Sequence, residues 1–159
     1  MATELYLALK VVHILSATIL FGTGLGTALH FWLVHRSGNV AAIAEVARNV
    51  VLADFALTAP AGIVQPLTGV ALAHLMGWPL LSPWLAASYA LYVLAFACWA
   101  PVVVLQIRAR DLAAEAARRG ERLPPAYARI MRWWFALGWP AFLALIAVFA
   151  LMVAKPDFG

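Results

Sequence analysis

The sequence predicts an all-α fold, a bundle of four antiparallel transmembrane helices with both termini on the outer side of a membrane. Of its 159 residues, 65% are hydrophobic and only 11% are charged, a balance outside that of water-soluble globular domains. The charged residues also gather between long apolar segments instead of recurring on every helix. We therefore expect residues 1–159 to form a single integral membrane domain, with membrane lipid as the partner of its surface.

The first two spans are expected at about residues 5–34 and 50–77. Each segment is long enough to cross a hydrocarbon core about 30 Å thick at a rise of about 1.5 Å per residue. A turn signal at Ser37-Gly38-Asn39 and a short amphipathic stretch separate the two. Pro60 and Pro66 interrupt the second span, where we expect kinks, because neighbouring helices can satisfy the carbonyl groups that a proline frees.

The last two spans are expected at about residues 84–107 and 133–154. Ser82-Pro83 opens the third helix with an N-cap residue followed by a proline at the first helical position. Beyond residue 107 this helix should continue into water through a stretch rich in arginine and glutamate, until Gly120 ends it. Tryptophans near the predicted span ends, such as Trp84, are typical of anchors at the membrane interface.

The distribution of arginines along the chain predicts how the protein is oriented in the membrane. Arg36 and Arg48 lie between the first and second spans, and seven more arginines lie between the third and fourth, whereas the second connection has none. Short loops rich in arginine and lysine stay on the cytoplasmic side, so both termini should face outward. We expect a multi-pass protein of a bacterial inner membrane. Its net charge of +4 then reflects topology, and no binding to nucleic acid is expected.

Two histidines on the outer side are the main candidates for function, because ionisable groups inside a span are expensive. His13 on the first span and His74 on the antiparallel second span should agree in height to within about 8 Å. Two neutral imidazoles on neighbouring helices are suited to bind the iron of a haem b as axial ligands. Alternatively, each histidine hydrogen-bonds a neighbouring helix. Lys10, one turn outward of His13, could pair with a haem propionate or extend to water.

His30 and Asp54 form a second expected pair, on the inner side. His30 lies four residues before the end of the first span, and Asp54 lies four residues after the start of the second, so the two should be level. The carboxylate could orient the imidazole and keep it protonated, or it could pair with an arginine at the inner interface. The remaining alternative is a place in a proton or substrate path.

Several motifs resemble known families. The segment Leu9-Lys10-Val11-Val12-His13-Ile14, with Gly24 and His35 after it, resembles the first helix of HemJ-type protoporphyrinogen oxidases. These are small bacterial membrane proteins that bind haem b, and CopD-like membrane proteins look related to them. The resemblance implies a haem-ligand role for His13. The whole chain more closely resembles a family of bacterial predicted integral membrane proteins of unknown function, including Gln65-Pro66-Leu67-Thr68-Gly69 and Phe135-Ala136-Leu137-Gly138-Trp139-Pro140.

These observations favour a membrane b-type haem protein with a redox role, an oxidoreductase acting on a quinone or a porphyrinogen. One alternative is a CopD-like protein that handles or transports a metal. Cu(I) sites favour Cys and Met ligands, and Met76 and Met152 lie near the outer side while Cys98 lies deeper. A membrane scaffold subunit without a cofactor is the other alternative. In each of these cases the protein could form a homo-oligomer.

Overall fold

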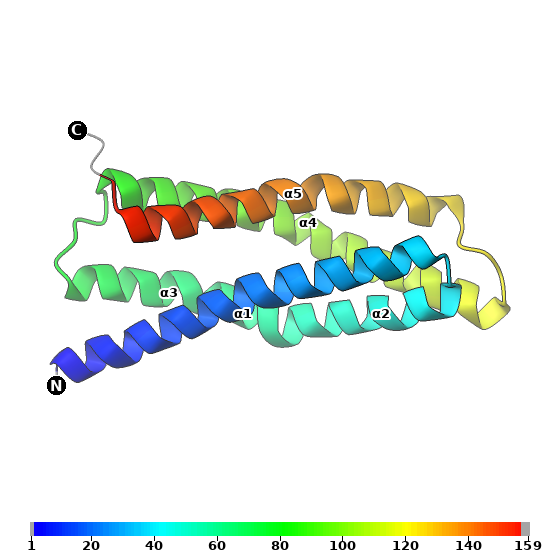
Figure 1. Ribbon diagram of the computed structural model, residues 1–159, viewed down its shortest axis with the longest axis horizontal. Helices are drawn as coiled ribbons and strands as arrows, with labels where there is room; N and C mark the ends of the chain where they lie inside the picture. The colour runs from blue at the N-terminus through cyan, green and yellow to red at the C-terminus, as the bar shows by residue number, and fades with distance from the viewer. Residues whose placement is uncertain (1, 157–159) are drawn as a thin grey trace.

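The computed structural model of the protein describes residues 2–156, and these form helices joined by short connections. No β-strand occurs in this range, which confirms the all-α prediction. Figure 1 shows α2, the π-helical turn η1 and α3 following one another beside α1, while α4 and α5 run side by side as a second layer. In chain order the elements are α1 (Ala2–Ser37), α2 (Val40–Ala53), η1 (Asp54–Thr58), α3 (Ala59–Leu75), α4 (Pro83–Arg119) and α5 (Pro125–Ala154).

Three helices of the described part, at Thr3–Ser37, Pro83–Arg119 and Pro125–Ala154, are long and apolar enough to cross a bilayer. They contain three of the expected spans and extend beyond them. The span expected at residues 50–77 is instead divided among α2, η1 and α3, and α3 has 17 residues, fewer than the about 20 typical of a spanning helix. The fourth crossing and the outward direction of the termini therefore stay predictions.

The turn η1 ends two residues before Pro60. Proline has no N–H group, and its ring clashes with the carbonyl four residues earlier, so it disturbs the regular pattern of helical hydrogen bonds. Here the N–H of Ala59 donates to the carbonyl of Asp54, five residues back instead of four. The irregularity expected at Pro60 therefore takes the form of a π turn, whereas α3 continues through Pro66.

The stretch between the first two expected spans is an amphipathic helix, as predicted. Asn39 caps α2, because its side-chain oxygen accepts a hydrogen bond from the N–H of Ala42 at 3.1 Å. Glu45 and Arg48 pair on the exposed face, and the hydrogen bond from Arg48 lowers the pKa of Glu45. The opposite face packs on α1 and α4 and buries a row of apolar residues, Ile43, Val46, Ala47, Val50 and Val51.

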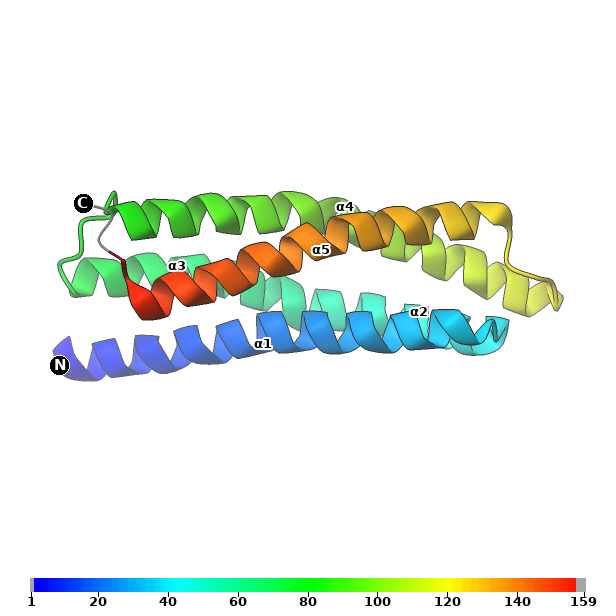
Figure 2. The ribbon, with the colours of Figure 1, turned by 45° about the horizontal axis from the view of Figure 1, so that its top comes forward.

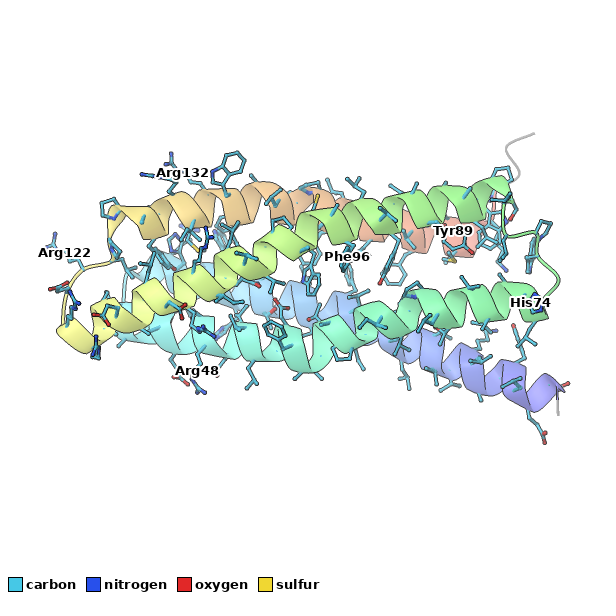
Figure 3. The ribbon with its side chains drawn as sticks, turned by 180° about the vertical axis from the view of Figure 1, so that it is seen from behind. Arg48, His74, Tyr89, Phe96, Arg122 and Arg132 are labelled. Atoms are coloured by element: carbon cyan, nitrogen blue, oxygen red, sulfur yellow. The ribbon has the colours of Figure 1, made fainter. Side chains whose placement is uncertain are left out.

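Both helices of the second layer reach beyond their expected spans at the same end. α4 continues without a break to Arg119, as predicted, and Gly120 ends it in a left-handed conformation with φ of 66°. α5 already begins at Pro125, eight residues before its expected span. Figure 3 shows Arg48, Arg122 and Arg132 at this end of the molecule and His74 at the opposite one. We call these the arginine end and the termini end.

The hydrophobic core is concentrated toward the arginine end. Its largest cluster includes Phe31, Ile43, Tyr127 and Trp134, and the rings of Phe31 and Trp134 meet edge to face with centroids 5.5 Å apart. Toward the termini end the buried cluster is small and consists of Ala73, Trp84 and Leu85. There α4 still packs along α5, but α1 touches α5 only sparsely (Figure 2). The two layers are therefore held together mainly at the arginine end.

Candidate functional site

His13 projects from α1 onto one face of α3. Its Nδ1 lies 2.8 Å from the hydroxyl oxygen of Thr68, and its Nε2 lies 3.2 Å from the amide nitrogen of Gln65. Gln65 and Thr68 are three residues apart and therefore share a helix face. Gly69 makes room for the ring, because a Cβ at this position would come within 3.2 Å of His13 Cε1. The imidazole is thus held between two side chains and a bare stretch of backbone.

The hydrogen bonds around His13 favour one position for the ring proton. The amide nitrogen of Gln65 is a donor and faces Nε2. The hydroxyl of Thr68 has backbone acceptors in the carbonyls of Val64 and Gln65, at 2.8 and 3.1 Å, so its oxygen can accept from His13. Nδ1 therefore carries hydrogen, and in the neutral ring Nε2 has a free lone pair, which accepts from the amide of Gln65. The Gln65 carbonyl oxygen accepts in turn from the hydroxyl of Ser16.

A cavity of about 210 Å³ opens beside His13. Its wall is apolar except at a few points, of which the imidazole and the Gln65 amide are the most polar. On the α4 side the hydroxyl of Tyr92 donates to the carbonyl of Gly62 at 2.6 Å. Side chains from α1, α3, α4 and α5 surround the space: His13, Ile14, Ala17, Thr18, Leu20, Phe21, Gln65, Tyr92, Leu145, Val148, Phe149 and Met152.

The structure does not bring His74 to this cavity. His74 is exposed near the last turn of α3, and it is not among the lining residues (Figure 3). It follows Thr68 by six residues, which at about 100° per residue turns its side chain well away from the face that meets α1. Met152, in contrast, does line the cavity together with His13. A ligand role for His74 stays a prediction.

The other expected site residues lie outside the cavity. Lys10 is exposed, and its Nζ sits 5.6 Å from the centroid of the Tyr6 ring. His30 is exposed, whereas Asp54 is buried, and no hydrogen bond or ion pair joins the two. In the part of the chain that the structure describes, no group of three or more His, Cys, Asp or Glu side chains comes together as a metal site.

From the sequence alone, we do not predict that Gln65 and Thr68 contact His13. Gln65, Thr68 and Gly69 are placed at spacings of three and four residues, which puts them on one face of a helix. Polar groups followed by a glycine on one face of a membrane helix indicate a close, hydrogen-bonded neighbour. This spacing, taken together with a histidine on the preceding helix, was the available signal.

A family described as predicted integral membrane protein (DUF2269) matches the chain over residues 7–156. The chain belongs to this family. The protein is therefore an integral membrane protein, and the expected membership in a family of unknown function is confirmed. The match spans the DUF2269 chain from α1 to α5 and includes both His13 and the residues that hold it. No curated protein and no solved structure matches the chain. The resemblance to HemJ-type oxidases and CopD-like proteins stays a hypothesis.

Proposed function

We propose that this DUF2269 protein binds a b-type haem in the cavity beside α1, with His13 Nε2 as an axial ligand. The hydrogen bond between His13 and Thr68 carries the proposal. Histidines that bind metals almost always donate their other ring N–H to a fixed acceptor, which sets the tautomer and the ring orientation. Here Nδ1–H is donated to Thr68 at 2.8 Å, and the lone pair of Nε2 is the one that iron would require.

The apolar wall supports the same proposal and indicates a second ligand. Sites for flat organic cofactors are mostly apolar with a few well-placed polar groups. Met152 is the cavity residue whose side chain is a soft metal ligand, and histidine with methionine is an established pair of axial ligands in b- and c-type sites. We therefore favour Met152 over His74 for the second axial position.

Binding of a haem requires two movements. Gln65 has to release Nε2, and the layers have to separate, because about 210 Å³ is less than the about 300–1,000 Å³ of small-molecule sites. The sparse contact between α1 and α5 makes the termini end the place where the layers can part. A bound haem supplies one-electron redox chemistry, which suits a quinone or a porphyrinogen dissolved in the membrane as the partner.

Absorption spectroscopy of protein purified from haem-supplied cells tests the proposal. We expect a Soret band in the wild type, its loss in His13→Ala and its retention in His74→Ala, which serves as the matched control. Met152→Leu should keep the haem but change the spectrum of the reduced state. Colourless wild-type protein, or a band that survives His13→Ala and vanishes in His74→Ala, would overturn the assignment. Elemental analysis of the same sample would reveal copper if a CopD-like role were correct.

A quinone bound directly in the cavity is the second candidate function, because a single quinone ring is smaller than a haem and requires less widening of a cavity of about 210 Å³. The amide of Gln65 has a second N–H to donate to a quinone carbonyl, and the hydroxyl oxygen of Tyr92, whose proton is donated to Gly62, can accept from a quinol hydroxyl. The Nε2 lone pair of His13 can do the same once Gln65 releases it. A short-chain ubiquinone analogue at about 100 times its Kd should then stabilise haem-free protein by about 2.7 kcal/mol. Gln65→Leu should abolish this stabilisation, and an unchanged melting temperature of the wild type would refute the idea.

A further inference from the structure

A second polar site lies inside the bundle, at the π turn. Asp54 and Thr58, one turn apart in η1, are each only 3% exposed, and Gln106 of α4 is 6% exposed. The side chains of Thr58 and Gln106 lie close enough to the Asp54 carboxyl group to hydrogen-bond with it. Yet the buried oxygens Asp54 Oδ2, Thr58 Oγ1 and Gln106 Oε1 have no hydrogen-bond partner among the described residues. Three unsatisfied oxygens thus gather at one buried point.

Thr58 differs from the other buried serine and threonine residues of the described chain. Ser16, Thr68 and Ser88 each reach a backbone carbonyl three or four residues earlier, at 3.0, 2.8 and 2.7 Å. Thr58 makes no such bond. Because it makes no such bond, the hydroxyl of Thr58 is available to the carboxyl group. Thr58 also lies in a π turn, in which the N–H of Ala59 donates to the Asp54 carbonyl, and π turns are frequent at functional sites.

No cation of the described chain compensates Asp54. In the described chain, no titratable group of the elements packed near η1 forms an ion pair or hydrogen bond with this carboxyl. Arg48 is engaged by Glu45, His30 and Arg108 are exposed, and His74 lies at the far end of α3. An ionised carboxylate buried without a cation is strongly destabilising. A neutral carboxylic acid avoids this cost.

One proton on Asp54 satisfies the whole group. The acid O–H then donates to the side-chain carbonyl of Gln106, and the hydroxyl of Thr58 donates to the remaining carboxyl oxygen. We propose that Asp54, Thr58 and Gln106 form a proton-binding site in which Asp54 carries an exchangeable proton. Asp54 precedes Gln65 by eleven residues, about 16 Å along the helix, so this site is separate from the cavity at His13. The proposal does not depend on haem binding.

Infrared spectroscopy of the full-length protein in lipid vesicles tests this site. We expect the carbonyl band of a protonated carboxylic acid at neutral pH, shifted in D₂O and absent from Asp54→Asn. Gln106→Leu and Thr58→Val should each shift the frequency of this band, because each removes a hydrogen-bond partner of the acid. Ser88→Ala, which removes a buried hydroxyl bonded to its own helix, should leave the band unchanged.

Three results would overturn the proposal. The first is a wild-type spectrum at neutral pH without a protonated acid band. The second is a band that keeps its frequency in folded Gln106→Leu and Thr58→Val, which remain informative should Asp54→Asn fail to fold. The third is a band that appears only when sodium is removed, because Asp54 would then bind a metal cation and not a proton.

Discussion

Gly69→Ala is the sharpest test of how His13 is seated. The new Cβ would lie 3.2 Å from His13 Cε1, so the ring has to yield by a few tenths of an ångström. Gly62→Ala is the matched control on the same helix, because its Cβ would meet only ordinary contacts at 3.7 Å with the Tyr92 hydroxyl and 3.8 Å with Leu20. Both changes gain the same helix propensity, about 1 kcal/mol, which cancels in the comparison.

The difference between the two variants then measures the crowding at the imidazole. Overpacking of this kind costs about 1–3 kcal/mol, so Gly69→Ala should be less stable than Gly62→Ala by about that amount. Reversible unfolding in mixed detergent micelles gives both free energies. Equal stabilities for the two variants would show that the ring does not lie against the α3 backbone, and the proton assignment on His13 would lose its basis.

Three further substitutions test individual contacts through the same unfolding measurement. Thr68→Val removes the acceptor for His13 Nδ1 and should cost about 0.6 to 1.7 kcal/mol, and a stability equal to wild type would argue against this bond. Gly120→Ala places a side chain at a left-handed φ of 66° and should cost about 1–2 kcal/mol, so no change would contradict the helix end. Asn39→Ala removes the cap on Ala42 and should cost about 0.5–2 kcal/mol, whereas Asn39→Asp should cost little.

Much of the helical framework could be predicted from the sequence, because the length of each apolar segment and the residues that begin or end a helix act locally. Gly38-Asn39 separates α1 from α2, and Gly120 ends α4, as expected from turn and cap residues. The division of the second expected span among α2, η1 and α3 was harder to predict. Composition shows that Pro60 disturbs a helix, but whether the disturbance becomes a kink or a π turn depends on how neighbouring helices pack.

His13 could be singled out from the sequence, but its partners could not. The height of a residue follows from its position along a helix, and by height His74 was a reasonable match. The direction of a side chain also depends on rotation about the helix axis, and small errors in the helix boundaries accumulate at about 100° per residue. Rotation places Thr68 and Gln65 against the imidazole and leaves His74 exposed.

The same limit applies to the pair expected on the inner side. His30 immediately precedes Phe31, which is fully buried in the main core, so the two neighbours point in different directions. His30 is therefore exposed while Asp54 is enclosed near α4. Which acids and bases meet in a bundle depends on the rotation of each helix, and composition does not determine it.

The concentration of the core near the arginine end has a consequence for motion. Amide hydrogens in tightly packed segments exchange with solvent only on global opening, while sparsely packed segments exchange through smaller, local fluctuations. The amide hydrogens in the first turns of α1 and the last turns of α5 should thus exchange faster than those in the half of the bundle at the arginine end. A hydrophobic molecule that diffuses within the bilayer could enter between α1 and α5 at the termini end, without passing through water.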